Sequence, residues 1–550
     1  MVDGEVGNRE FAFDAVVVGA GFAGLYMLHR LRGLGMSAVV LEQAAGVGGT
    51  WYWNRYPGAR CDSESYYYCY SFDRELEQEW TWTERYPRQP EIKAYLDHVA
   101  DRFDLRRDIR FSTTVTGARA DADGRGWTVT TTGAEAGERT VRCRFLITAV
   151  GCLSAANVPD LPGLESFAGR WFHTGQWPHE GVDVAGRRVG VVGTGSTGIQ
   201  AIPVLAETAA HTTVFQRTAN YSIPARNGPL SDAESRRYKA DYPQIREVQA
   251  QSTNGHPFVI NQQSALEVGA SERDAAYRAA WERGGLRFRA AYRDLLADEA
   301  ANETASEFIR DRIREIVRDP ATAERLLPRD HGFATKRPPI DTHYFETYNR
   351  DDVTLVDVRS DPIEAVVPEG LRLRSGTVHP LDDLVFATGF DALTGPLLRL
   401  DPAGPDGTTL GEAWREGPRT YLGLAISGFP NLFTITGPFS PSVLTNMPSS
   451  IEQHVDWIAG CLEHLRDTGT DRIEADPAAE REWAEHNRQA ADATLLPRAA
   501  TSWYLGANVP GKPSVFMPYA GGFARYAATC TDVARSGYRG FRLGAPRAAA

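Results

Sequence analysis

The sequence Phe13-Asp14-Ala15-Val16-Val17-Val18-Gly19-Ala20-Gly21-Phe22-Ala23-Gly24 places an apolar stretch directly before a glycine-rich turn. Glycines with this GxGxxG spacing allow a βαβ unit to turn tightly and let its backbone approach a pyrophosphate closely. The pyrophosphate of such a unit lies on the positive N-terminal end of the helix that follows the turn. The stretch therefore predicts a dinucleotide-binding unit whose first strand covers Phe13 to Val18.

A second turn of the same design, Gly193-Thr194-Gly195-Ser196-Thr197-Gly198, follows the apolar stretch Val189 to Val192. A single GxGxxG is weak evidence, because many such hexapeptides are ordinary loops. Two of them in strand-turn-helix context favour two dinucleotide sites over one site and a structural Rossmann-like layer. The sequence therefore predicts an α/β protein with two Rossmann-like dinucleotide-binding domains.

The residues that end the next strand differ in charge between the two units. In the first unit Val39-Val40-Leu41-Glu42 ends in an acid, which would accept hydrogen bonds from an unphosphorylated ribose, as in FAD or NAD. In the second unit the strand Thr212 to Phe215 runs into Gln216-Arg217-Thr218, which has no acid. An arginine there favours a 2′-phosphate. We therefore expect FAD in the first unit and NADPH in the second.

The composition and charge limit which partners and which cellular compartment we expect. A formal net charge of −12 over 550 residues argues against nucleic acid or an anionic membrane as a partner. Residues 1–9 resemble neither a secretory signal nor a transit peptide, and no apolar run approaches membrane-spanning length. We therefore expect a cytoplasmic protein that contacts neither nucleic acid nor membrane, and that is a monomer or a weak homo-oligomer.

Cysteine and histidine spacing excludes two other kinds of site. The six cysteines include no CxxC pair, so the electron relay of disulfide reductases is not expected; they are Cys61, Cys69, Cys143, Cys152, Cys461 and Cys530. The 12 histidines form no HExxH or comparable ligand pattern. The sequence predicts no metal.

Changes in pattern along the chain indicate the domains. Two further apolar strands that end in glycine, Arg144 to Gly151 and Asn431 to Gly437, suggest that one sheet is built from distant segments. Charged, helix-forming sequence, with an apparent capping box at Ser271-Glu272-Arg273-Asp274, separates the two β-rich parts. We expect a discontinuous FAD domain (1–150 and 385–550), an NADPH domain (151–224 and 332–384, with a Pro- and Gly-rich linker at 153–180) and a helical insertion (225–331).

The linker contains the most specific motif of the chain. The segment Phe167-Ala168-Gly169-Arg170-Trp171-Phe172-His173-Thr174-Gly175-Gln176-Trp177-Pro178 matches FxGxxxHxxxW followed by proline. It resembles the fingerprint of type I Baeyer-Villiger monooxygenases, formed here by Phe167, Gly169, His173 and Trp177. The aromatic segment Gly48 to Asp62, Lys336-Arg337-Pro338, Ala387 to Asp391 and Ser502 to Asn508 extend the resemblance over nearly the whole chain, toward the phenylacetone and steroid monooxygenase branch.

The resemblance implies a reaction and two catalytic residues. In the family NADPH reduces FAD, the reduced flavin takes up dioxygen as a peroxide, and that peroxide converts a ketone to an ester or lactone. A fixed cation beside the flavin must stabilise the anions that form in a dry site. Arg337 matches the catalytic arginine, and Asp62 is its expected carboxylate partner. Without the motif, the pair would be read as a structural salt bridge.

The resemblance also assigns cofactor contacts. Arg217, Thr218 and Lys336 match the binders of the NADPH 2′-phosphate, and Trp503 matches a residue that hydrogen-bonds the nicotinamide nucleotide. The remaining expected FAD and NADPH contacts are Gly19, Gly21, Phe22, Ala23, Gly24, Glu42, Thr50, Trp51, Asp62, Tyr68, Val115, Met447, Gly193, Thr194, Gly195, Ser196, Thr197, Gly198, Gln200 and Arg337. His173 is expected to govern domain movement rather than proton transfer.

One departure and two alternatives stay open. Relatives often have a small residue where this chain has Phe439, in a loop expected near the substrate, so the preferred ketone does not carry over from the family. An N- or S-oxidising flavin monooxygenase would share the flavin chemistry, and sulfoxidation could accompany ketone oxidation. A redox-sensing protein that binds both cofactors without turnover is the alternative from another class.

Overall fold

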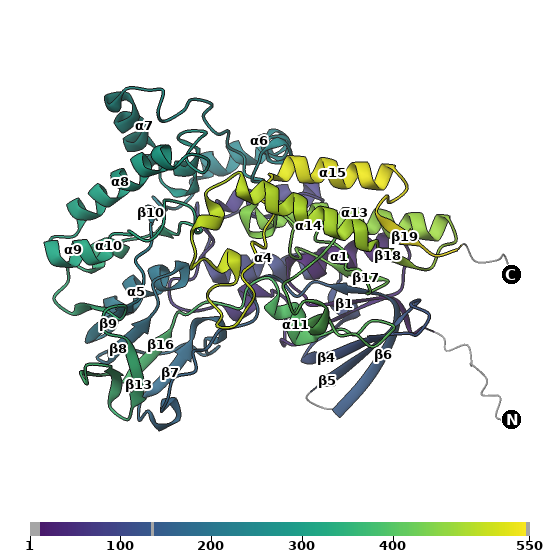
Figure 1. Ribbon diagram of the computed structural model, residues 1–550, viewed down its shortest axis with the longest axis horizontal. Helices are drawn as coiled ribbons and strands as arrows, with labels where there is room; N and C mark the ends of the chain where they lie inside the picture. Colours follow the sequence, from purple (N-terminus) through teal and green to yellow (C-terminus); the bar gives the residue numbers. More distant parts are fainter. Residues whose placement is uncertain (1–10, 134–136, 546–550) are drawn as a thin grey trace.

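The computed structural model describes residues 11–133 and 137–545. Figure 1 shows two separate sheets, one that contains β1, β4, β5, β6 and β17 and one that contains β7, β8, β9 and β16. Helices α7, α8 and α9 lie above the second sheet in this view, and α13, α14 and α15 lie above the first. Each sheet therefore carries its own helical cover.

The first sheet has the strand order β3-β2-β1-β6-β5-β4, and β17 pairs with β6 outside this path. Strands β3, β2, β1, β6 and β17 are parallel, whereas β6, β5 and β4 form an antiparallel meander. Its strands are β1 (Phe13–Val18), β2 (Ala38–Leu41), β3 (Ile109–Arg110), β4 (Thr113–Ala120), β5 (Trp127–Gly133), β6 (Gly137–Thr148) and β17 (Leu432–Thr434).

The second sheet is parallel throughout, in the order β12-β9-β8-β16-β7. Its strands are β7 (Arg170–His173), β8 (Arg188–Val192), β9 (His211–Gln216), β12 (Val353–Asp357) and β16 (Asp383–Phe386). Three smaller sheets are formed by β13 (Ile363–Val367), β14 (Gly370–Leu373) and β15 (Val378–Pro380), by β10 (Ile223–Pro224) and β11 (Ile340–Asp341), and by β18 (Ile473–Ala475) and β19 (Phe541–Leu543).

The helices fall into three sets. Helices α1 (Phe22–Gly33) and α5 (Ser196–Thr208) follow the two glycine turns. The insertion contains α6 (Asp232–Gln251), α7 (Ala270–Arg283), η5 (Gly285–Ala290), α8 (Glu299–Ile316) and α9 (Pro320–Leu326). The others are α2 (Thr50–Trp53), α3 (Arg74–Glu79), α4 (Gln89–Arg102), α10 (Tyr344–Thr347), α11 (Gly395–Leu400), α12 (Leu410–Ala413), α13 (Met447–Asp467), α14 (Pro477–Asp492), α15 (Phe523–Arg535) and the short 3-10 helices η1 (Ser65–Tyr67), η2 (Arg106–Asp108), η3 (Leu164–Ser166), η4 (Thr174–Gln176), η6 (Ser442–Leu444), η7 (Leu496–Arg498) and η8 (Trp503–Leu505).

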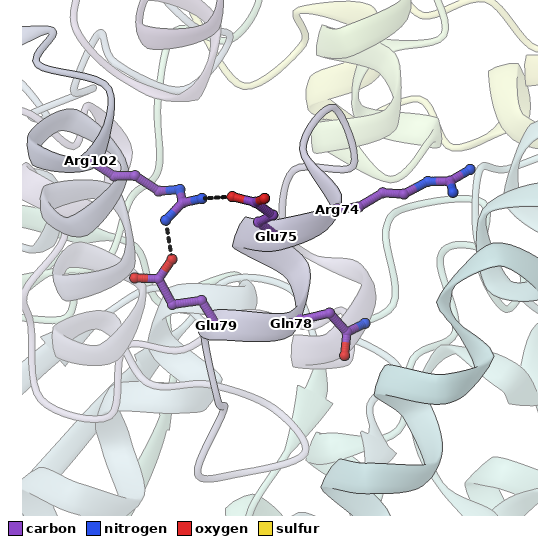
Figure 2. Close-up of a pocket in the computed structure, with 5 residues that line it drawn as sticks. All are labelled: Arg74, Glu75, Gln78, Glu79 and Arg102. Atoms are coloured by element: carbon purple, nitrogen blue, oxygen red, sulfur yellow. Dashed lines mark hydrogen bonds and ion pairs between the residues drawn. The ribbon is translucent and has the colours of Figure 1, made fainter.

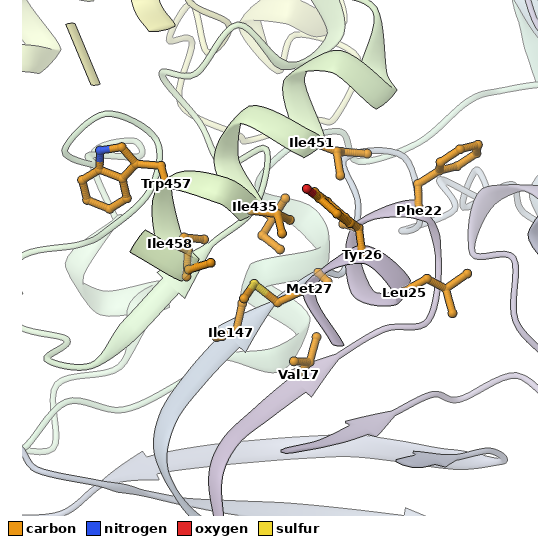
Figure 3. Close-up of a cluster of buried hydrophobic side chains, with 14 of the residues drawn as sticks. Val17, Phe22, Leu25, Tyr26, Met27, Ile147, Ile435, Ile451, Trp457 and Ile458 are labelled. Atoms are coloured by element: carbon orange, nitrogen blue, oxygen red, sulfur yellow. The ribbon is translucent and has the colours of Figure 1, made fainter. Parts of the chain in front are cut away.

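Both faces of the first sheet are buried. On one face, Val17 of β1 and Ile147 of β6 meet Met27 of α1 and Ile451 and Ile458 of α13 (Figure 3). On the other face, Val16 and Val18 pack with leucines of α11 and α12. Burial on both sides explains why these strands are continuous apolar runs rather than alternating ones. The sheet therefore holds the first glycine turn on a rigid base.

Strands β1, β2, β8 and β9 are confirmed within one residue, whereas β6 begins seven residues earlier than expected and β6 and β17 each end three residues before the expected glycine. Two other expectations are wrong. Ser271 does not cap a helix: α7 begins at Ala270 after the N-cap Gly269, and no side chain caps it. The actual capping boxes are Ser231 with Glu234 and Thr409 with Glu412. A capping box needs Glu or Gln at the third helical position, and Asp274 does not supply it.

The second correction concerns the segment expected to be a linker. Residues 153–180 contain β7, which pairs in parallel with β16 as the outer strand of the second sheet. The fingerprint therefore lies partly in a strand. The expected boundary at 384/385 would cut β16, so a boundary after Phe386 keeps this strand whole. In the part of the chain that the structure describes, no helix is both long and apolar enough to cross a bilayer.

Candidate active site

A cleft of about 1410 Å³ is lined by residues of both glycine turns. Its wall also includes the aromatic segment around Trp51, the dipeptide Lys336-Arg337 and Trp503 from the C-terminal region. Its volume exceeds the 300–1,000 Å³ or so that is usual for a single drug-sized ligand. The cleft therefore brings the two predicted dinucleotide sites together.

A second, shallow pocket lies on the surface between α3 and α4 (Figure 2). Its charged side chains pair with one another, since Arg102 contacts Glu75 at 3.0 Å and also contacts Glu79. These groups are exposed, where ion pairs contribute little and leave no unbalanced charge for a ligand. The large cleft is therefore the candidate active site.

The first glycine turn has the geometry that its spacing predicts. Gly19 has φ +104°, and a Cβ there would lie 2.6 Å from the carbonyl oxygen of Ala149. A Cβ at Gly24 would overlap the carbonyl oxygen of Gly19, so this glycine packs helix on strand. No side chain caps α1, and its first turn has no acid. Its N-terminal N–H groups therefore suit a phosphate of FAD.

Glu42 lies at the end of β2 with its carboxylate buried beside the first turn. Its two oxygens accept the N–H groups of Ala20 at 2.6 Å and Ala44 at 2.7 Å. Burial raises the pKa of this carboxyl, although both hydrogen bonds act in the opposite direction. Each carboxylate oxygen has a second lone pair, so Glu42 can still accept a hydrogen bond from a ribose.

The second turn repeats this design. Gly193 has φ +110°, and a Cβ there would lie 2.5 Å from the carbonyl oxygen of Ala387. A Cβ at Gly198 would overlap the carbonyl oxygen of Gly193, whereas a Cβ at Gly195 would meet no protein atom within 4 Å. No side chain caps α5, and its first turn also has no acid. The turn therefore fits a second pyrophosphate, with Gly195 facing open space.

Cations gather beside the second turn. Arg217, Thr218 and Lys336 all line the cleft, and the Thr218 carbonyl accepts the hydroxyl of Thr194 at 2.8 Å. Burial lowers the pKa of Lys336, and Arg217 and Arg359 act in the same direction although Asp330, 3.6 Å away, opposes them. The arrangement suits a 2′-phosphate, because a dianion would relieve this repulsion. Arg359 is a further cation near the proposed 2′-phosphate site that the sequence alone did not single out.

The aromatic segment contributes buried rings beside the first turn. Trp51 lies in α2, and its indole Nε1 donates to the hydroxyl of Tyr68 at 3.2 Å. Their rings meet edge to face with centroids 5.9 Å apart. All expected cofactor contacts line the cleft except Gly24 and Gly198, which pack helix against strand instead. Thr50, Val115 and Met447 are among those that line it.

Arg337 and Asp62 meet in this cleft although 275 residues separate them. Arg337 Nε donates to Asp62 Oδ2 at 2.6 Å, and Nη2 donates to Oδ1 at 2.8 Å. Nη1 donates to the carbonyl oxygen of Val443 at 2.6 Å. Burial would raise the pKa of Asp62, but the Arg337 guanidinium outweighs it and holds that pKa below its usual value. The pair is therefore ionised and fixed in orientation.

Three neighbours of this pair were missed by sequence reasoning. Val443 supplies its carbonyl oxygen, and the buried Tyr504 hydroxyl lies beside Arg337, whose charge opposes the rise that burial causes in the Tyr504 pKa. His256 Nε2 lies 3.2 Å from the hydroxyl of Ser63, next to Asp62. Tyr504 adjoins Trp503 in the quoted motif, which was an available signal; Val443 and His256 gave none.

None of the four fingerprint residues lines the cleft, and of these only His173 lies in the second sheet. His173 ends β7, is buried, and accepts the N–H of Gly175 at Nδ1 at 3.0 Å. Burial lowers its pKa to about 4, so this imidazole is neutral at pH 7. A Cβ at Gly169 would overlap the carbonyl oxygen of Asp382, and Trp177 packs in the core beside Phe172. Phe167 packs in the neighbouring cluster.

Gln200 joins the second unit to the aromatic segment of the first. Its Oε1 accepts the hydroxyl of Tyr56 at 2.8 Å, and its Nε2 donates to the carbonyl oxygen of Arg60 at 3.2 Å. A Cβ at Gly58, where φ is +83°, would overlap the Gln200 carbonyl oxygen. This contact joins the two units at the wall of the cleft, which Tyr56, Arg60 and Gln200 line.

Phe439 lies in the core of the first unit rather than on the cleft wall. Its side chain is 3 % exposed and belongs to the hydrophobic core of the first unit, and it is not among the residues that line the cleft. Its φ is +66°, a conformation that a bulky residue rarely adopts and a glycine adopts freely. A glycine at this position would therefore relieve backbone strain.

Comparisons with known proteins agree with this geometry. Residues 13–227 match the family model described as flavin-binding monooxygenase-like. A protein named Baeyer-Villiger monooxygenase from Pseudooceanicola batsensis is 44% identical over 96% of this chain and 95% of its own length. A solved structure of oxidised steroid monooxygenase bound to NADP is 53% identical, with a TM-score of 0.91 over 96% of this chain and 99% of that one.

A solved complex of OTEMO with FAD and NADP is 39% identical, with a TM-score of 0.92 over 98% of this chain and 100% of that one. The two-cofactor cleft and these comparisons lead to one conclusion: the chain belongs to the type I Baeyer-Villiger monooxygenases, and its cofactors are FAD and NADP(H).

Proposed function

We propose that this enzyme converts ketones to esters or lactones with NADPH and dioxygen, and that Arg337 and Asp62 form its reaction centre. The observation that carries the assignment is the bidentate Arg337–Asp62 pair in the cleft between the two glycine turns. When bound, FAD supplies the transfer of electrons from NADPH and the activation of dioxygen.

Arg337 provides a permanent positive charge where negative charge develops on the carbonyl oxygen of the ketone. A guanidinium keeps its proton at any working pH, so it stabilises an anion without a proton transfer of its own. Two of its nitrogens are held by Asp62 and a third bond goes to Val443, which leaves further N–H donors for the reaction. Asp62 therefore acts as the residue that aims the guanidinium.

The same proposal assigns the cofactor sites. FAD binds on the first turn with Glu42 at the ribose, and its domain is formed by 1–150 and the C-terminal part. NADPH binds on the second turn with Arg217, Thr218 and Lys336 at the 2′-phosphate and Trp503 at the nicotinamide nucleotide. Residues 225–331 form the helical insertion between them. The uncapped starts of α1 and α5 support both positions.

Compartment and assembly belong to the proposal as well. All six cysteines are free and buried, as suits a protein kept in a reducing compartment. We therefore place the enzyme in the cytoplasm, as a monomer or a weak homo-oligomer, with no nucleic acid or membrane partner. Among the described residues no group of three His, Cys, Asp or Glu side chains could hold a metal ion.

The test pairs a ketone with a sulfide under ¹⁸O₂ at several pH values. Ester that carries one ¹⁸O atom, with NADPH and dioxygen consumed in equal amounts, is the expected result. Sulfoxide without ester from any ketone would identify an S-oxidising enzyme instead. Tight binding of both cofactors with no substrate-stimulated NADPH oxidation would identify a redox-sensing protein.

A further inference from the structure

Lys336 lines the cleft and has a carboxylate beside it. Its Nζ lies 3.6 Å from Oδ2 of Asp330, and the two side chains are 13 % and 21 % exposed. Among the described residues, Asp330 is the only carboxylate that forms an ion pair with Lys336. The other cation of the proposed phosphate site, Arg217, is exposed. Lys336 is therefore the half-buried cation of this site, and one carboxylate faces it.

The length of this ion pair decides what it can do. A separation of 3.6 Å is longer than a hydrogen bond, so the pair leaves the three N–H groups of the ammonium to a ligand. The ammonium of a lysine ends a flexible four-carbon stem, so its direction depends on the charges around it. A fixed carboxylate at this distance can therefore hold Lys336 at the cleft wall without using its hydrogen bonds.

His331 fixes the carboxylate of Asp330 at its other oxygen. Nδ1 of His331 lies 2.6 Å from Asp330 Oδ1, and this nitrogen donates because a carboxylate only accepts. The imidazole is 1 % exposed and meets the ring of Tyr221 edge to face, with centroids 5.3 Å apart. Its Nε2 lies 3.4 Å from Oδ1 of Asn220, which lines the cleft. Asp330 thus offers one oxygen to a packed imidazole and the other to Lys336.

The charges around Lys336 make this carboxylate necessary. Burial would raise the pKa of Asp330, but the hydrogen bond from His331 and the charge of Lys336 hold it at about 2, so the carboxylate is ionised at pH 7. Without it, Lys336 would face burial and the repulsion of Arg217 and Arg359 alone. Asp330 therefore keeps the ammonium charged and in place before a phosphate arrives.

We propose that Asp330, held by His331, positions Lys336 toward the 2′-phosphate and thereby sets the preference of the enzyme for NADPH over NADH. The inference rests on the proposed phosphate site at Arg217 and Lys336. It adds a positioning residue that acts through Lys336 and leaves the proposed reaction centre unchanged.

The kinetic test compares NADPH with NADH in the full holoenzyme of Asp330→Asn. This substitution keeps the size of the side chain and an oxygen for His331 but removes the charge. We expect the KM for NADPH to rise about tenfold, and the KM for NADH and the kcat with NADPH to stay within twofold. Asp274→Asn is the matched control, because Asp274 is a carboxylate on the surface of α7 that pairs with Arg278 at 2.7 Å. A KM for NADPH that is constant or falls would overturn the proposal, since the carboxylate would then only repel the phosphate.

A double variant shows whether Asp330 acts through Lys336. In the Lys336→Met background, Asp330→Asn should leave the KM for NADPH within twofold of the value for Lys336→Met alone, because the group to be positioned is already gone. A further tenfold rise in the double variant would overturn the positioning role and indicate a general structural effect.

Calorimetry of the oxidised holoenzyme with adenosine 2′,5′-bisphosphate and with adenosine 5′-monophosphate provides a readout without turnover. We expect Asp330→Asn to lose about tenfold in affinity for the bisphosphate and none for the monophosphate; no loss, or equal losses for both, would overturn the inference. If Lys336→Met binds the bisphosphate as the wild type does, the proposed phosphate site fails and the inference fails with it. If both nucleotides bind as expected while no ketone is oxidised, the proposed function fails and the positioning role stands.

Discussion

The two glycine turns share one backbone design but are followed by side chains of opposite charge. Both have a first glycine at φ above +100° and a last glycine that allows no Cβ, and both helices start without a side-chain cap. After the next strand the first unit presents the carboxylate of Glu42, whereas the second presents the exposed Arg217. On the proposed assignment, the turn selects a dinucleotide, and the end of the following strand selects which one.

The proposed reaction centre belongs to neither unit alone. Asp62 follows the aromatic segment of the first unit, and Arg337 follows the helical insertion within the second. If the chemistry lies where the units meet, a change there should remove activity and leave both cofactor sites intact.

Arg337→Ala should have the largest effect. We expect ester formation to fall at least a thousandfold, about 4 kcal/mol of transition-state stabilisation, because the cation at the developing oxyanion is lost. FAD content by absorbance and the Kd for NADP should stay within a few fold of wild type. Arg350→Ala, which removes an exposed pair with Asp352, serves as control. Retained ester formation would refute the assigned role.

Alanine at the two later glycines of the second turn should separate packing from ligand binding. Gly198→Ala should lower the free energy of unfolding by about 2 kcal/mol or more, because its Cβ would overlap the Gly193 carbonyl oxygen. Gly195→Ala should keep wild-type stability but raise the KM for NADPH about tenfold, since its Cβ meets only the open cleft. Thermal denaturation and steady-state kinetics measure the two effects. Equal stability of both variants would contradict the packing difference.

Arg217→Gln tests whether the positive charge after the second turn selects NADPH. Loss of one cation at the 2′-phosphate should raise the KM for NADPH about 10- to 100-fold, as expected for a lost charge-assisted contact of about 1.5–3 kcal/mol. The KM for NADH should not change, because NADH lacks that phosphate. Initial rates with both nucleotides measure the ratio, with Arg350→Gln as the matched surface variant. A parallel rise for NADH would place the phosphate elsewhere.

Acid should destabilise both units through buried histidines. His173 in the second sheet and His454 on α13 have their pKa values lowered by burial, to about 4 and about 3. Their unfolded pKa is about 6.5, so the unfolded chain binds protons first as pH falls from 6.5 toward 4. Each site should cost about 2 kcal/mol of unfolding free energy by pH 5.

Denaturant titrations at pH 7.5 and 5 measure this loss. His173→Asn keeps an acceptor near Nδ1 for the N–H of Gly175 and should reduce the pH dependence by that amount. His454→Asn does the same for the N–H of Thr436. A wild-type stability that does not change over this range would show that the imidazoles are protonated in the folded state.

The parts of the fold that were predictable are those fixed by local pattern. Continuous apolar runs before glycine located β1, β6, β8 and β17, because parallel strands buried on both faces have this signature. β7 was not predicted, because Arg170-Trp171-Phe172-His173 is short and lies among prolines and glycines. Its place at the edge of the sheet depends on pairing with β16, more than 200 residues away.

The residues of the candidate site also divide into those that the sequence could locate and those that it could not. Glycine spacing located both nucleotide positions, but the meeting of Arg337 with Asp62 came only from the family resemblance, because nothing local links residues 275 apart.

The pairing of β17 with β6 has a consequence for synthesis. The first sheet begins at Phe13, but its last parallel strand, Leu432–Thr434, is made only after the whole second sheet has left the ribosome. A nascent chain can thus fold the inserted unit first, while the edge of β6 that pairs with β17 is still unpaired. Truncation before residue 432 would leave that edge open to pairing with other chains, so β17 protects the sheet from edge-to-edge aggregation.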